Sequence, residues 1–127
     1  MSTRSRGDGG QTTVELALAL PVVAVMALGL LQVGLVVRDQ ILVTHAAREA
    51  VRAAAVSDDP AASQAAAERG ASGLDPDRLR VVVVEREEPG GSVEVRVTYR
   101  AATELPLVGT LMGDADLHAS AVMRVEE

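Results

Sequence analysis

The sequence predicts an α+β protein in which one long N-terminal helix precedes a short second helix and a three-stranded antiparallel sheet. Three observations carry this prediction. Residues 16–37 form a 22-residue run without a charged side chain. The alanine-rich segment after it has apolar residues at three- and four-residue spacing, the period of a helix. Beyond Pro76 apolar and polar residues alternate, which is the period of a strand.

The apolar run is long enough to cross a membrane. At ~1.5 Å per residue it extends roughly 33 Å, whereas the hydrocarbon core of a bilayer is about 30 Å thick. A buried helix of a soluble domain is one alternative, but a 127-residue chain with no Phe and no Trp has little core to surround it. A cleavable signal peptide is another, yet its apolar region spans only about 7–15 residues. We therefore expect a transmembrane helix over residues 11–38, in contact with the lipid bilayer.

The charges on the two flanks of the run predict its orientation. Arg4, Arg6 and the N-terminal amine precede it, whereas Arg38 and Asp39 cancel each other after it. The positive-inside rule then keeps the N-terminus in the cytoplasm and makes residues 39–127 an extracytoplasmic domain. This domain has 9 arginines against 16 acidic residues, a net charge of −7. Such a charge argues against a nucleic-acid partner, because phosphates would be repelled.

Residue usage gives two further expectations. The chain has no cysteine, so its outer domain must be held together by side-chain packing without disulfides. All 12 basic residues are arginine, and asparagine is absent. This usage is typical of GC-rich codons, and we expect a protein of the bacterial cell membrane.

A single helix is predicted from about Thr13 to Val56, through the span and onward as an amphipathic stalk. The stalk has an apolar stripe that needs a partner surface, made of Leu42, Val43, Ala46, Ala47, Ala50, Val51 and Ala54. A second helix is predicted from Pro60 to Arg69, where Gly70 follows.

The strands are predicted at residues 79–87, 92–100 and 117–125. Turn residues 88–91 join the first two into a hairpin. The sheet and the stalk should pack together, since each has one apolar face to bury. Residues 105–112 are unusually apolar for a connection. We leave open whether they cover the sheet edge or contact lipid headgroups or a partner subunit.

The motif that indicates a function stands at the start of the span. A basic leader, residues 1–10, ends in Gly10, and Glu15 lies five residues later where the apolar helix begins. This arrangement resembles the prepilin processing site, at which a prepilin peptidase cuts, here between Gly10 and Gln11. Glu15 also has a structural explanation, because Thr12 begins a Thr-x-x-Glu capping box. The two explanations do not exclude each other.

The wider pattern resembles the TadE-like family of Flp (tight-adherence) pilus assembly proteins. The resemblance is carried by residues 10–21 (Gly-Gln-Thr-Thr-Val-Glu-Leu-Ala-Leu-Ala-Leu-Pro), by residues 44–55 with their Ala-Ala-Arg-Glu sequence, and by residues 119–126. It implies a pilin-like fold and a minor-pilin-like membrane protein that supports biogenesis of a thin adhesive pilus. It also implies two kinds of partner: the prepilin peptidase, and other pilus assembly proteins or pilins that contact the transmembrane and stalk helix.

Two functional hypotheses remain. The first is a TadE-like minor pilin or assembly component that acts by protein–protein contacts. The alternative is a single-pass pseudopilin, or a scaffold or binding module, of another envelope secretion system. Cleavage at Gly10 distinguishes them, because only the first requires it.

We expect neither an enzyme nor a cofactor or metal site. Asp116, His118 and Ser120 alternate along one predicted strand, so neighbours are ~7 Å apart, too far for the hydrogen bonds of a catalytic triad. His45 has one nearby carboxylate, Glu49, and no second histidine, which is too few ligands for a metal.

Overall fold

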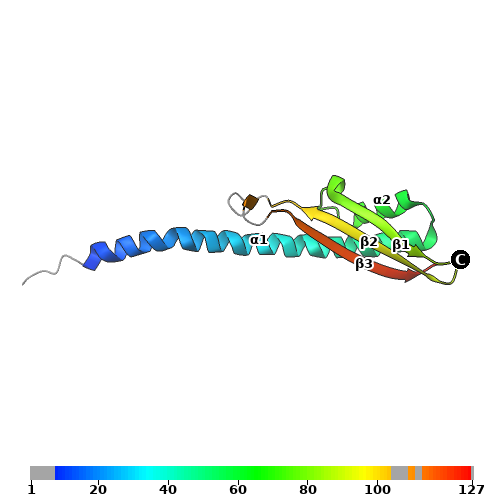
Figure 1. Ribbon diagram of the computed structural model, residues 1–127, viewed down its shortest axis with the longest axis horizontal. Coiled ribbons are helices and arrows are strands. Elements are labelled where there is room, and N and C mark those ends of the chain that lie inside the picture. The colour runs from blue at the N-terminus through cyan, green and yellow to red at the C-terminus, as the bar shows by residue number, and fades with distance from the viewer. Residues whose placement is uncertain (1–7, 104–108, 111–112, 127) are drawn as a thin grey trace, which may run out of the picture.

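The structure, a computed structural model, describes residues 8–103, 109–110 and 113–126. It confirms the α+β prediction: a long N-terminal helix, a short second helix and a three-stranded antiparallel sheet (Figure 1). In chain order the elements are α1 (Asp8–Val56), α2 (Pro60–Gly70), the 3-10 helix η1 (Pro76–Arg78), β1 (Leu79–Arg86), β2 (Ser92–Ala101) and β3 (Ala115–Arg124).

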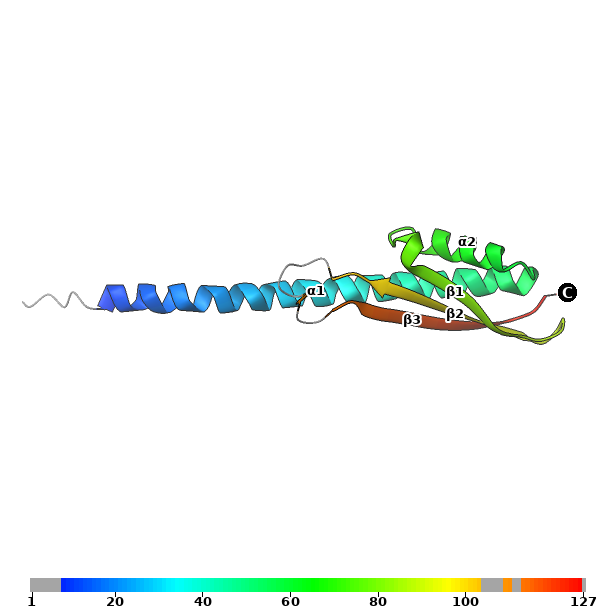
Figure 2. The ribbon, with the colours of Figure 1, turned by 45° about the horizontal axis from the view of Figure 1, so that its top comes forward.

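The N-terminal half of helix α1 is exposed, whereas its C-terminal half is covered by the rest of the protein. It contains 49 residues and continues through Pro21, so it is ~73 Å long at 1.5 Å per residue. Residues 9–27 are exposed throughout, and the first buried side chain is that of Gln32. Both views show the sheet and α2 lying along the C-terminal half only (Figures 1 and 2). The N-terminal half therefore projects from the domain.

The covered half of α1 supplies the centre of the core. Most of the predicted apolar stripe is buried, and it packs against β2 and β3 on one side and α2 on the other. The stripe that was expected to need a partner surface thus finds it within the same chain. Small side chains allow the two helices to approach closely: a Cβ on Gly70 would lie only 2.9 Å from Cγ of Glu49.

The sheet has the order β1-β2-β3, with both pairs antiparallel. As predicted, alternate residues of β2 form its buried face: Val93, Val95, Val97 and Tyr99. One irregularity was not predicted. Val83 pairs with Val95 but Glu85 pairs with Glu94, so Val84 is an extra residue in β1 and its side chain is exposed.

The turn between β1 and β2 is held by a carboxylate. Glu87 accepts hydrogen bonds from the backbone N–H of Ser92 at 2.7 Å and from its hydroxyl at 3.0 Å. These bonds hold the pKa of Glu87 below its usual value, because they favour the ionised form. Their stabilisation is therefore present above the ordinary pKa of a glutamate and is lost as the pH falls through the lowered one. Gly90, at φ 91°, provides the left-handed residue of the turn.

Helix glutamines bind both edges of the sheet. The side-chain amide of Gln64, on α2, donates to the carbonyl of Leu79 at 3.0 Å and accepts from the N–H of Val81 at 3.2 Å. The Gln40 amide of α1 donates to the carbonyl of His118 on β3 at 3.2 Å. Backbone groups at both edges are thereby paired within the chain, which lowers their tendency to bind another strand.

The connection between β2 and β3 is described only at its base and at Gly109 and Thr110. The hydroxyl of Thr103 donates to the carbonyl of Gly113 at 2.6 Å and so joins the two ends of the connection. The rest of residues 105–112 lies outside the described part of the chain, and both interpretations of this apolar segment remain predictions.

The C-terminal end of α1 is fixed by one side chain of β1. Nη1 of Arg86 donates to the carbonyls of Ala54 and Ser57, the latter at 3.1 Å. Its Nε lies 2.6 Å from Oδ1 of Asp58. A cation at this position satisfies carbonyls that have no partner within the helix and interacts favourably with the helix dipole.

Replacing Arg86 with alanine should destabilise the protein by about 1.5–3 kcal/mol, the range for hydrogen bonds to charged groups. The matched control is Arg96→Ala, since Arg96 is on the neighbouring strand and only lies 3.8 Å from Glu94, with half of its side chain exposed. That change should cost at most about 0.5 kcal/mol. Thermal unfolding of the full chain in detergent compares the two variants, and equal destabilisation would contradict the capping role.

Candidate functional site

The three residues of the predicted processing site lie at the beginning of α1. Gly10, Gln11 and Glu15 are all exposed, within the first two turns of the helix. Gln11 and Glu15 are four residues apart and so lie on the same helical face. Among the described residues, apart from the adjoining ones and the backbone of its own helical turns, no atom lies within 4 Å of the position that a Cβ on Gly10 would occupy. A larger residue at position 10 therefore meets no steric obstacle among the described residues.

The capping explanation for Glu15 is wrong. Helix α1 begins at Asp8, not near Thr13, so residues 12–15 lie inside the helix. The hydroxyl of Thr13 donates to the carbonyl of Gly9, one turn earlier, at 2.8 Å. The error has a physical reason: glycines are weak helix formers, but extending an existing long helix costs far less than nucleating one. Glu15 thus has no capping function to account for it.

The carboxylate of Glu15 is unpaired within the described residues: no hydrogen bond or ion pair to it is found there. It is followed at once by a surface that is apolar on all sides. The large side chains of this surface are more than half exposed: Leu16, Leu18, Leu20, Val22, Val23, Val25, Met26, Leu30, Leu31, Val33 and Val37. A helix apolar all round is normally surrounded by lipid or by other protein.

Helix α1 is long and apolar enough to cross a membrane, and its most apolar 18-residue window has no buried residue in this protein. This agrees with single-pass membrane anchoring. The site is therefore a carboxylate beside two glycines at one end of an apolar, uncovered helix. Chemically it offers exposed backbone amides and the carboxylate of Glu15.

The other polar groups considered from the sequence are not brought together. Asp116 lies 3.4 Å from Nε of Arg100 across the β2–β3 pair, and His118 is opposite Thr98. His45 and Glu49 line a shallow hollow beside Arg69. Over residues 8–103, 109–110 and 113–126, no group of three His, Asp or Glu is arranged to hold a metal.

Sequence reasoning missed one feature, a cavity beside Tyr99. The alternation of β2 correctly placed this side chain on the buried face. The other walls of the cavity come from α1 and from the segment before β1, which are distant in sequence. The only available signal was a lone tyrosine at the end of a predicted strand.

The comparison with protein families gives one match. The family model described as TadE-like protein matches residues 10–52, which contain the candidate site, the apolar run and most of the stalk. This confirms the resemblance drawn from the sequence over residues 10–52, whereas residues 119–126, which also carried it, lie outside the match. Comparison with curated proteins and with solved structures yields no match.

Proposed function

We propose that the chain is a membrane-anchored minor pilin or assembly component of a Flp-type (tight-adherence) pilus, on the basis of the TadE-like match over residues 10–52. The match indicates a role in Tad/Flp pilus systems, and proteins of this family are generally not enzymes. The observation that supports the finer proposal is the uncovered N-terminal half of α1, because it offers a long apolar surface for other helices.

The shape of the molecule fits a role in assembly. The C-terminal half of α1 has its apolar stripe covered by the sheet and α2, so the domain does not need a partner to bury it. The N-terminal half has no such cover. In a membrane this half contacts lipid, and within an assembly it contacts the corresponding helices of other pilins or assembly proteins.

The proposal includes processing by a prepilin peptidase between Gly10 and Gln11. This bond lies in a helical turn, which must open before a peptidase can cut it. Gly9 and Gly10 favour opening, since each glycine weakens a helix by about 1 kcal/mol relative to alanine. Cleavage would leave the amine of Gln11 as the new N-terminus. Glu15 would then offer its carboxylate to such an amine, in particular to that of a neighbouring subunit.

The proposed orientation puts the N-terminus in the cytoplasm and the domain outside. Because the chain has no cysteine, single cysteines can report it. In a host without prepilin peptidase, Ser120→Cys, on the exposed face of β3, should react with a membrane-impermeant maleimide in intact spheroplasts. Ser5→Cys, in the leader, should react only after lysis. The reverse pattern would contradict the orientation.

A replacement of the helix tests the proposed function. In a bacterium that makes Flp pili and carries this chain, deletion of its gene should abolish surface pili, and the full chain should restore them. A second chain keeps the domain but replaces residues 8–38 with the span of an unrelated single-pass protein. It should reach the membrane, as fractionation would show, yet fail to restore pili. Equal restoration by both chains would contradict assembly through α1.

A further inference from the structure

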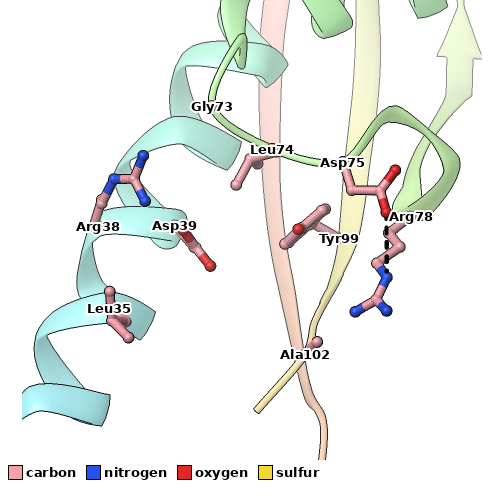
Figure 3. Close-up of a pocket in the computed structure, with 9 residues that line it drawn as sticks. All are labelled: Leu35, Arg38, Asp39, Gly73, Leu74, Asp75, Arg78, Tyr99 and Ala102. Carbon is pink, nitrogen blue, oxygen red and sulfur yellow. Dashed lines mark ion pairs between the residues drawn. The ribbon is translucent and has the colours of Figure 1, made fainter. Parts of the chain in front are cut away.

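A cavity of ≈ 210 Å³ lies where α1 leaves its apolar run. Its walls come from three parts of the chain, as Figure 3 shows: α1 on one side, the segment from Gly73 to Arg78 on the other, and Tyr99 of β2 between them. It is smaller than the ~300–1,000 Å³ of pockets that hold drug-sized ligands. Its volume suits a small polar group.

Tyr99 is the only aromatic residue of the whole chain, and it is 7% exposed. No hydrogen bond to its hydroxyl is found in the described part of the chain. Among the described residues, the buried side-chain polar atoms without a partner belong to Gln32 and Ser63, so the hydroxyl of Tyr99 is not one of them and is open to solvent. Here the hydroxyl belongs to a side chain that lines the cavity, so it can donate a hydrogen bond to a ligand there.

Two guanidinium groups line the same cavity. Arg38 forms no ion pair or hydrogen bond within the described residues, and its Nη2 would lie 3.1 Å from a Cβ on Gly73. Arg78 lies opposite, with Nε 3.5 Å from Oδ2 of Asp75 and about half of each side chain exposed. Exposed pairs of this kind are weak, so Arg78 is available to a stronger acceptor. Guanidinium groups and a tyrosine hydroxyl are donors suited to a phosphate.

Two carboxylates balance these charges. Asp39 and Asp75 both line the cavity, so its ionised groups sum to zero. A ligand with only negative charge would gain little from such a site. A zwitterion with a phosphate and an ammonium a few bonds apart can place its phosphate by the arginines and its ammonium by the carboxylates.

The position of the cavity indicates where such a zwitterion comes from. Leu35 belongs to the apolar run, whereas Arg38 and Asp39 are the first charged residues after it. With α1 in a bilayer, these residues lie at the boundary between hydrocarbon and headgroups, where tyrosine is enriched. Residues 39–127 carry a net charge of −7, which disfavours an anionic lipid surface.

We propose that this cavity binds the phosphoethanolamine headgroup of a membrane phospholipid. The phosphate accepts hydrogen bonds from Tyr99, Arg38 and Arg78, and the ammonium lies by the two carboxylates. The lipid would fix the height and rotation of the domain on the membrane surface. This inference requires that α1 spans a membrane, but it does not depend on a role in pili.

Tyrosine fluorescence provides a direct test, since Tyr99 is the sole aromatic fluorophore. The full chain in detergent micelles is titrated with dihexanoyl phosphatidylethanolamine. A saturable change is expected, at concentrations roughly tenfold or more below those required for dihexanoyl phosphatidylglycerol or inorganic phosphate. Arg38→Gln should weaken binding by about tenfold, and Asp39→Asn should reduce the preference over phosphatidylglycerol. Arg124→Gln, at the far end of β3, should change nothing.

Three results would overturn the proposal. If phosphatidylglycerol binds as tightly as phosphatidylethanolamine, the carboxylates do not select the headgroup. If inorganic phosphate binds as tightly as phosphatidylethanolamine, the cavity is a site for a free anion. Unchanged binding by a folded Arg38→Gln variant, with wild-type circular dichroism, would place the lipid elsewhere. As a second measurement, native mass spectrometry of wild type from membranes should detect a retained phosphatidylethanolamine that Tyr99→Phe lacks. Equal retention by that variant would also count against the site.

Discussion

Replacing Glu15 with glutamine should abolish pilus production while the protein still inserts into the membrane. Glutamine has nearly the same size and helix propensity, so α1 should be unchanged. What is lost is the negative charge of Glu15, which has no ion pair in the described protein. A carboxylate that becomes buried among the apolar helices of an assembly is costly unless a cation neutralises it, and the amine of a neighbouring processed chain is such a cation.

Glu49→Gln is the matched control for this prediction. Glu49 is also on α1 and exposed, but it lies in the covered half of the helix beside α2. The same chemical change there should leave pili in place. Counting pili by electron microscopy, with immunoblots of the membrane fraction, measures both variants. Normal piliation with Glu15→Gln would remove Glu15 from the proposed mechanism.

Replacing Ala50 with leucine should give the largest loss of stability among single changes of this kind in the domain. Ala50 is fully buried at the centre of the stripe where α1 meets the rest of the core. A larger side chain would push these elements apart, which typically costs 1–3 kcal/mol. For a domain of about 60–100 residues, each kcal/mol lowers the melting temperature by about 4–8 °C. Ala61→Leu, exposed on α2, should have little effect.

Melting of the full chain in detergent, followed by circular dichroism, checks this prediction. A core made mostly of valine and alanine, without disulfides, gives the domain a small free energy of unfolding, so the loss should be easy to measure. An Ala50→Leu variant as stable as Ala61→Leu would show that the interface has room for larger side chains.

The elements with strong periodicity were predictable from the sequence. The buried stripe of α1 and the buried face of β2 follow from spacings of three or four and of two, because these periods decide which side chains share a face. Features that depend on contacts between distant segments were not predictable. The edge contacts of Gln64 and Gln40, the bulge at Val84 and the cap by Arg86 all require knowing which elements become neighbours.

The candidate site was predicted for a different reason. Gly10 and Glu15 carry out no structural task that the fold displays: one has open space around it and the other has no ion pair in the described protein. A motif that another protein recognises need not make contacts within its own chain. The role of Gly10 and Glu15 is therefore inferred from the family resemblance. The cavity beside Tyr99 shows the opposite case, since only the folded chain brings its residues together.

Changes at the two glycines separate peptidase recognition from helix stability. Gly10→Val should block cleavage if the peptidase requires a small residue before the cut, although nothing in the described part of the protein obstructs the valine. Gly9→Ala, also in open space, strengthens the helix without changing the residue before the bond. It should therefore be cleaved. If both variants are cleaved, the requirement for a small residue at position 10 is wrong.

The most direct test is the intact mass of the wild-type chain from a host that carries an active prepilin peptidase of a Flp-type system. The account predicts a mature protein that begins at Gln11 and lacks residues 1–10. A chain that keeps this leader while the peptidase cleaves its own pilin in the same cells would contradict the proposed role as a processed minor pilin.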